Sequence, residues 1–124
     1  MLDTNALSAW ADSDRALLRI LPKDRLWHLP VVALGEFLFG IRRSRERTKL
    51  QRWLVEVKAA CALVSIDPDS ADQYADLREE LRASGTPIPE NDIWIAALCR
   101  QHRLALVSRD GHFDKVRGLR RVEW

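Results

Sequence analysis

The uncharged run from Ile93 to Cys99 constrains the fold more than any other stretch of this chain. It follows Glu90, Asn91 and Asp92, which suit the first turn of a helix because free backbone N–H groups there favour oxygen atoms. A helix without charged residues is buried around most of its circumference. We therefore expect a helix enclosed by other elements, with the Asp92 carboxylate at its mouth. A buried acid needs a partner, although simple helix capping would also account for this position.

The composition is that of an ordinary globular protein. The 124 residues are 47% hydrophobic and 31% charged, which is enough for a core without disulfides or structural metal. We expect one domain over residues 1–124, with Cys61 and Cys99 as buried free thiols because each stands alone in an apolar stretch. The sequence has no apolar run that could span a bilayer and does not begin with a signal pattern. These features predict a cytoplasmic protein that does not contact a membrane.

Hydrophobic periodicity divides the chain into alternating helices and short strands. The sequence predicts helices at residues 6–10, 14–21, 30–41, 46–59, 67–83 and from 90 onward. It predicts strands at residues 26–29, 61–66, 104–108 and 119–123, and one helical turn at 113–116. Any strand before Asp3 is very short, Pro22 is expected to end the second helix, and Gly85 the fifth. This alternation indicates an α/β fold with a mainly parallel central sheet.

Four acids lie where such a fold would bring them together. Asp3 and Asp110 stand where strands end, and ligands of parallel sheets bind at the carboxyl ends of the strands. Glu36 and Asp92 are on helices that can reach the same cleft. Carboxylates repel one another, so a site that holds several needs protons or cations. Oxygen ligands favour Mg²⁺ or Mn²⁺, and two such ions about 4 Å apart can promote phosphodiester cleavage. We expect metal-dependent phosphoester hydrolysis.

Four short motifs surround these acids. They are Leu2-Asp3-Thr4-Asn5; Val32-Ala33-Leu34-Gly35-Glu36-Phe37 with Gly40; Pro87-Ile88 through Asn91-Asp92 with Ile95-Ala96-Ala97; and Val107-Ser108-Arg109-Asp110 with His112-Phe113 and Gly118-Leu119. Each motif is common alone, but their order and spacing over nearly the whole chain are specific. In these respects the sequence resembles PIN-domain ribonucleases, and among them the VapC-like toxins of bacterial toxin–antitoxin pairs.

The resemblance implies a PIN-like three-layer fold, with a short central sheet between helices and an acidic catalytic site for Mg²⁺ or Mn²⁺. The implied catalytic and metal-binding residues are Asp3, Glu36, Asp92 and Asp110. Asp3 and Asp92 are expected to bind metal directly. Glu36 could bind metal, hold a water molecule on the metal, or help to activate that water.

The resemblance also implies a substrate and partners. Asn5 and Ser108 would complete the polar, substrate-binding lining. Arg109 could contact a phosphate, although an exposed salt bridge fits its position equally well. The expected substrate is an RNA, whether tRNA, rRNA or mRNA. The expected partners are a cognate protein antitoxin that inhibits the enzyme, and further copies of these chains in a homodimer or a toxin–antitoxin hetero-oligomer.

Two other functions fit parts of the sequence. A phosphatase could use Asp3 as its nucleophile, but the second acid that haloacid-dehalogenase-like phosphatases carry two residues later is Asn5 here. A non-catalytic PIN-like module could keep the fold and bind RNA or protein. The presence of all four acids argues against such a module.

Several other side chains are interpreted without a catalytic role. His28, His102 and His112 show no ligand spacing among themselves and are left outside the site. Trp53 and Trp94 have aliphatic neighbours at helical spacing, which favours core or subunit contacts over base stacking. The arginines at positions 42, 43, 45 and 47 could track an RNA backbone, but a solvated helix end is the simpler interpretation.

Overall fold

The computed structural model describes residues 1–21 and 25–124, so Pro22 lies outside the described residues. The helices are α1 (Thr4–Ala11), α2 (Arg15–Ile20), α3 (Val31–Arg42), α4 (Arg47–Ala60), α5 (Pro68–Ala83) and α6 (Glu90–His102). The strands are β1 (Trp27–Pro30), β2 (Cys61–Val64), β3 (Leu106–Val107) and β4 (Arg121–Val122), and η1 (Gly111–Lys115) is a 3-10 helix. The predicted alternation of helices and strands is confirmed.

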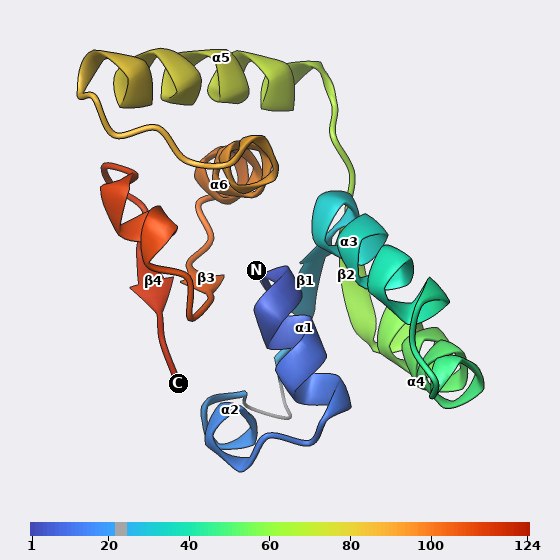
Figure 1. Ribbon diagram of the computed structural model, residues 1–124. Helices are drawn as coiled ribbons and strands as arrows, with labels where there is room; N and C mark the ends of the chain where they lie inside the picture. Colours follow the sequence, from blue (N-terminus) through green and yellow to red (C-terminus); the bar gives the residue numbers. More distant parts are fainter. Residues whose placement is uncertain (22–24) are drawn as a thin grey trace.

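The N-terminal segment joins two parallel strand pairs into one sheet. β1 pairs with β2 and β3 with β4, both in parallel. Leu2 donates its backbone N–H to the His28 carbonyl at 2.9 Å and forms a parallel bridge with Val107. The order is therefore β2, β1, the segment at residues 1–3, β3 and β4. Figure 1 shows the N-terminus between the two strand pairs. From residues 1–3 the chain adds β1 and β2 on one side, and it then returns to add β3 and β4 on the other side. This change in strand order creates a topological switch point between residues 1–3 and β3.

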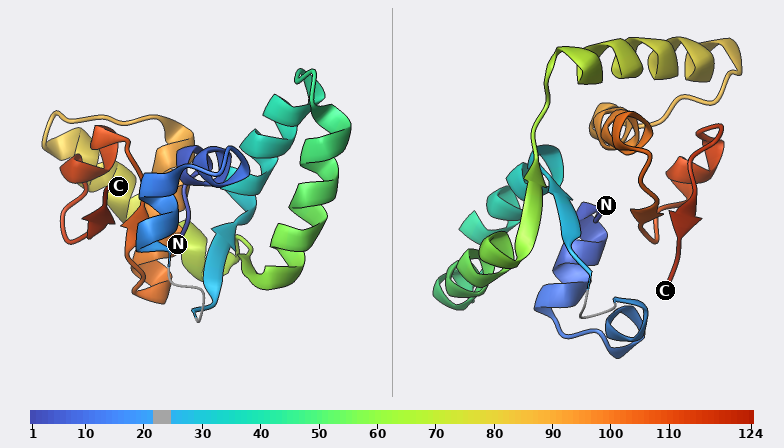
Figure 2. Two further views of the ribbon diagram at one scale, coloured as in Figure 1. Left: turned by 90° about the horizontal axis from the view of Figure 1, so that it is seen from below. Right: turned by 180° about the vertical axis from the view of Figure 1, so that it is seen from behind.

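Helices cover the strands on both sides. Figure 1 shows α6 and α5 on one side and α1 and α2 on the other, and Figure 2 shows the same arrangement from two further directions. The uncharged run of α6 is buried, with only Trp94 between Ile93 and Cys99 partly exposed. Burial on nearly all sides is the expected result for this helix, because α5 packs along it and the sheet lies beneath it. This helix places Asp92 at its N-terminal end.

Local capping chemistry explains where α5 begins and ends. Asp67 accepts a 2.8 Å hydrogen bond from the backbone N–H of Ser70, whose hydroxyl accepts one from the N–H of Asp67 at 3.1 Å. This reciprocal pair is a capping box, and Pro68 occupies the first turn. Gly85 has a φ of 66°, a left-handed conformation that ends the helix with little strain. The predicted start of this helix near residue 67 and its predicted end at Gly85 are confirmed.

β2, β3 and β4 are shorter than the sequence predicts. The strand expected at residues 104–108 is reduced to Leu106–Val107, because the backbone N–H of Leu104 bonds to the Cys99 carbonyl and so closes the end of α6. β2 ends at Val64 and not at residue 66 as predicted, and its Leu63 is 50% exposed. Leu63 is exposed because, within the described residues, β2 lies at the edge of the sheet and pairs with β1 alone.

The remaining core predictions concern cysteine and tryptophan. Cys61 and Cys99 are both free and buried, as expected. Trp53 contacts the rings of Trp10 and Phe37, which confirms a packing role. Trp94 stacks on a tyrosine of α5 with ring centroids 4.1 Å apart. No helix in the described ranges is long and apolar enough to cross a membrane.

Candidate active site

Asp3 lies at the switch point of the sheet and caps α1. Its carboxylate accepts hydrogen bonds from the backbone N–H of Thr4 at 2.7 Å, from Asn5 Nδ2 at 2.6 Å and from Ser108 Oγ at 2.6 Å. The residue is only 4% exposed. Burial raises the pKa of Asp3, and the hydrogen bonds from Ser108 and Thr4 oppose that shift because they favour the charged form. The carboxylate is therefore held in one orientation by three donors.

Glu36 projects from α3 and connects three elements. Its Oε1 atom accepts a 2.6 Å hydrogen bond from Asn91 Nδ2 on α6. Its Oε2 atom accepts a short hydrogen bond from the hydroxyl of Thr4 on α1. Thr4 and Asn91 therefore fix the position of the Glu36 carboxylate from two sides.

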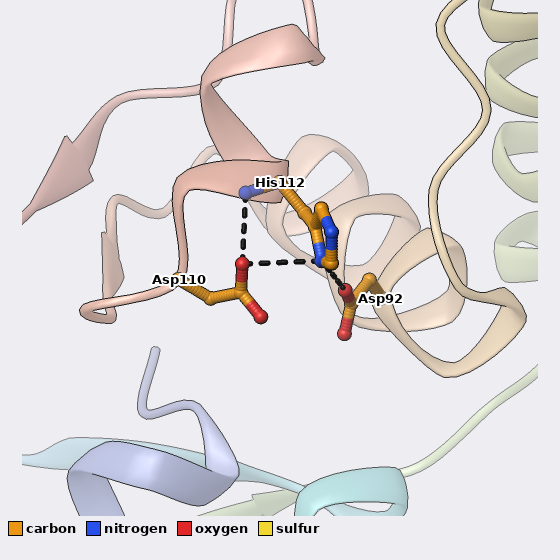
Figure 3. A group of neighbouring side chains, drawn as sticks. All are labelled: Asp92, Asp110 and His112. Carbon is orange, nitrogen blue, oxygen red and sulfur yellow. Dashed lines mark hydrogen bonds and ion pairs between the residues drawn. The ribbon is translucent and has the colours of Figure 1, made fainter.

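Asp92, Asp110 and His112 form a tight group where the start of α6 meets η1 (Figure 3). Asp92 is the third residue of α6, and Asp110 caps η1 by accepting a 2.8 Å hydrogen bond from the backbone N–H of His112. The Nδ1 atom of His112 lies 3.3 Å from Asp92 Oδ2 and 3.1 Å from Asp110 Oδ1. One ligand atom from each residue lies within 4.8 Å of the other two. The group therefore has the dimensions of a site for one metal ion.

Electrostatics link the two sides of the site. Burial, followed by the negative charges of Asp110 and Asp3, raises the pKa of Asp92 to about 6, while His112 acts in the opposite direction. The charges of Glu36 and Asp110 likewise add to the raised pKa of Asp3. The charges of Asp3 and Asp110 thus act on Asp92, and that of Glu36 acts on Asp3, but only Asp92 and Asp110, with His112, lie at metal-ligand distances from one another among the described residues.

The donors fit a divalent cation. Asp92 Oδ2 and His112 Nδ1 are buried and have no hydrogen-bond partner within the described part of the chain. No lysine or arginine among the described residues forms an ion pair with any of the four acids, and His112 alone is within ion-pair distance of Asp92 and Asp110. Several uncompensated carboxylates in one place are unfavourable unless a cation binds. Carboxylate oxygens are the ligands that Mg²⁺ and Mn²⁺ prefer.

The expected substrate-binding residues lie beside the acids but contact the protein itself. Asn5 and Ser108 bond to Asp3 and to each other, with Asn5 Nδ2 3.0 Å from Ser108 Oγ. The guanidinium of Arg109 pairs with Asp14 at 3.0 Å and lies 4.4 Å from the ring centre of Trp124. Of the two interpretations offered for Arg109, the structure contains the exposed salt bridge.

Three residues of this site, His112, Thr4 and Asn91, were not predicted from the sequence. Spacing among the three histidines indicates no ligand set, yet His112 lies between two acids. Its position two residues after Asp110 was the available signal. Thr4 and Asn91 were recognised only as parts of motifs. Both hold Glu36, from positions 32 and 55 residues away in sequence.

Known proteins share this sequence pattern and fold. The model of the PIN-domain family matches residues 1–119. Ribonuclease VapC5 of Mycobacterium tuberculosis is 30% identical over an alignment of 125 positions, which covers 99% of this chain and 91% of the relative. The crystal structure of VapBC2 from Rickettsia felis bound to a DNA fragment from their promoter matches at 24% identity with a TM-score of 0.87, over 100% of this chain and 97% of the other. The crystal structure of VapBC-5 from Mycobacterium tuberculosis, a member of the VapBC family of toxin–antitoxin systems, matches at 27% identity with a TM-score of 0.74. This match covers 98% of this chain and 94% of the other.

Proposed function

The chain belongs to the PIN-domain family, and we propose that it is a divalent-metal-dependent endoribonuclease of the VapC type. It hydrolyses phosphodiester bonds of a cytoplasmic tRNA, rRNA or mRNA, and it is the toxin of a toxin–antitoxin pair. The observation that carries this proposal is the group of Asp92, Asp110 and His112, whose ligand atoms lie within 4.8 Å of one another, beside the buried carboxylate of Asp3. The VapC ribonuclease among its relatives supports RNA as the substrate.

The metal would be Mg²⁺ or Mn²⁺, held directly by Asp3 and Asp92 with Glu36 and Asp110 beside them. When bound, such an ion polarises a phosphoryl oxygen and makes water a better nucleophile. The chain's own contribution is to hold the carboxylates in place before the substrate arrives. Preorganised groups of this kind need little rearrangement during the reaction.

The neighbouring polar residues position the acids. Ser108 and Asn5 hold Asp3 through two 2.6 Å hydrogen bonds. Asn91 holds one oxygen of Glu36, and in this position the carboxylate would accept a proton from water. A substrate contact by Arg109 would require its guanidinium to leave Asp14.

An antitoxin segment would fit the groove between α1, α3 and α4. This groove has a volume of about 340 Å³, and Glu36 lies on its wall together with the apolar side chains of Phe37, Ile41 and Leu50. A segment with apolar side chains would fill the groove, and a cationic side chain on it would reach the acidic site. Such binding would exclude RNA from the carboxylates, which explains how a protein partner can inhibit the enzyme.

We also propose that residues 1–124 form one domain that assembles as a homodimer or as a toxin–antitoxin hetero-oligomer. Large apolar side chains remain exposed on α3, α4 and β2, where Phe39, Val55 and Leu63 are 63%, 65% and 50% exposed. Exposed apolar surface of this kind is typical of protein–protein contacts.

The two alternative functions are less compatible with these contacts. A phosphatase of the haloacid-dehalogenase type needs a second acid two residues after its nucleophile, whereas Asn5 stands there and donates a 2.6 Å hydrogen bond to Asp3. A non-catalytic module gains nothing from four carboxylates that repel one another. A binding role therefore accounts for the fold but not for the site.

The deciding experiment is RNA cleavage by the antitoxin-free chain in Mg²⁺ or Mn²⁺. We expect cleavage by the unmodified chain and by Asp114→Asn, whose carboxylate pairs with Arg121 outside the site. We expect none after chelation or with Asp92→Asn. Equal cleavage by a folded Asp92→Asn variant would remove Asp92 from the mechanism. Cell toxicity that persists with this variant would favour the binding module.

A further inference from the structure

We propose that His112 is a nitrogen ligand of the metal in this site, and that the site consequently binds Mn²⁺ more tightly than Mg²⁺. This inference rests on the proposed function, because it concerns the same ion. The inference adds His112 to the ligands expected from the four acids and states which metal ion an imidazole ligand favours.

The distances around His112 Nδ1 suit ligands of one ion. Neighbouring ligands at right angles, each about 2.1 Å from a metal, lie about 3.0 Å apart. Nδ1 is 3.3 Å from Asp92 Oδ2 and 3.1 Å from Asp110 Oδ1. All three ligand atoms lie within 4.8 Å of one another. Small side-chain movements would therefore bring the three atoms onto adjacent positions around one cation.

The surroundings of Nδ1 leave it available to a metal. The His112 side chain is 43% exposed as a whole, but its Nδ1 atom is buried and has no hydrogen-bond partner within residues 1–21 and 25–124. Asp92 Oδ2 is also buried without a hydrogen bond, although it faces His112 Nδ1 at 3.3 Å. Buried polar atoms without hydrogen bonds are uncommon and call for an explanation such as an ion. A shared cation would satisfy both atoms at once.

The fold fixes the position of the imidazole. Asp110 caps η1 and accepts a 2.8 Å hydrogen bond from the backbone N–H of His112. The next residue, Phe113, is completely buried in the core. With a hydrogen bond on one side and a buried ring on the other, the backbone of His112 is held close to Asp92. The position of the His112 imidazole is thus set by the packing of Phe113 in the core.

An imidazole ligand changes which ion is preferred. Mg²⁺ binds oxygen ligands and releases its waters reluctantly, so it gains little from a nitrogen. Imidazole suits transition metals, and Mn²⁺ also accepts carboxylates and water. A site with carboxylates and one imidazole therefore discriminates in favour of Mn²⁺, whereas a site of four acids alone would not.

The test uses the full chain, free of antitoxin and loaded with Mn²⁺. Electron spin echo modulation detects ¹⁴N bound directly to Mn²⁺, and calorimetry gives the affinities of Mn²⁺ and Mg²⁺. We expect directly bound ¹⁴N in the unmodified chain and in His102→Gln, a control for an exposed histidine at the end of α6. His112→Ala should lose this signal and bind Mn²⁺ about 10-fold more weakly, with Mg²⁺ affinity changed less than about 2-fold.

The outcomes separate this inference from the proposed function. Bound Mn²⁺ without direct ¹⁴N in the unmodified chain would overturn the role of His112, whether or not the variant folds. Undiminished Mn²⁺ affinity in a folded His112→Ala chain would do the same. RNA cleavage that still depends on Asp92 would leave the proposed function standing in both cases. Absence of both Mn²⁺ binding and RNA cleavage in the unmodified chain would overturn both proposals.

Discussion

The Oγ atom of Ser108 donates a 2.6 Å hydrogen bond to Oδ2 of Asp3, a residue 105 positions earlier in the chain. Ser108 is completely buried and Asp3 nearly so, so this bond is shielded from water. It joins the N-terminal strand to the end of β3 at the switch point of the sheet. The first acid of the site is therefore held by the last quarter of the chain.

Replacing Ser108 with alanine should weaken both the fold and the site. The substitution leaves a buried carboxylate with one donor fewer, and such losses lower the free energy of unfolding by about 1–3 kcal/mol. Mn²⁺ affinity should fall about 10-fold, because groups that orient a metal ligand typically contribute that much. Urea denaturation and calorimetry measure the two effects, with Ser65→Ala on an exposed loop as the control. Unchanged values for both would show that Asp3 does not depend on this bond.

Asp92 should make the metal-free protein less stable as the pH rises. Its pKa is raised to about 6 from an ordinary value of 3.8, so the folded state favours the protonated acid, and stability is lost between about pH 4 and pH 6. Asp92→Asn removes that penalty. In a chelator it should raise the free energy of unfolding by roughly 1–2 kcal/mol at pH 7.5 and by little at pH 4.

Asp114→Asn is the matched control for this effect. The ion pair with Arg121 lowers the pKa of Asp114, so the charged form stabilises the folded state. This variant should lose stability at pH 7.5, where Asp92→Asn gains it. Thermal unfolding at the two pH values measures both. A loss of stability in both variants at pH 7.5 would contradict the assignment of Asp92 as an uncompensated buried acid.

Metal binding should weaken in acid. Because the Asp92 carboxylate must be ionised to bind a cation, protons compete with Mn²⁺ below pH about 6. The affinity should fall at least about 10-fold for each pH unit below that value and level off above it. Calorimetry between pH 5 and pH 8 provides the profile. An affinity independent of pH across this range would exclude Asp92 as a ligand.

Glu36→Gln should preserve the fold and reduce catalysis. Glutamine keeps the side-chain length and one oxygen that can accept the hydrogen bond from Asn91, but it cannot accept a proton from water. We expect kcat/KM for a single-stranded RNA to fall at least about 100-fold, with unchanged thermal unfolding. Glu46→Gln, an exposed partner of Lys49, is the control. Full activity of Glu36→Gln would assign Glu36 to structure alone.

Arg109→Ala distinguishes a structural contact from a substrate contact. The guanidinium pairs with Asp14 and stacks on Trp124, and exposed contacts of these kinds contribute up to about 1 kcal/mol each. We expect a similarly small loss of stability with unchanged KM for RNA. A KM raised several-fold with unchanged stability would instead show that Arg109 leaves Asp14 to bind phosphate.

Structural features that depend on residues close together in the sequence could be predicted. The burial of α6 follows from its uncharged run, and the bounds of α5 follow from Asp67, Pro68 and Gly85. Strand lengths could not be predicted in the same way. β3 is short because the backbone of Leu104 completes the end of α6, and apolar side chains alone do not reveal where a backbone N–H finds its carbonyl.

The sequence by itself determined the α/β class, the order of helices and strands, and the four acids as candidates for one site. Tertiary structure decided which donors hold each acid. Thr4 and Asn91 reach Glu36 across 32 and 55 residues, and His112 meets Asp92 only because η1 folds back over the start of α6. The reason is physical. Helix periods and caps are set by hydrogen bonds within a few residues, whereas contacts between distant residues exist only after burial of the apolar faces has brought their elements together.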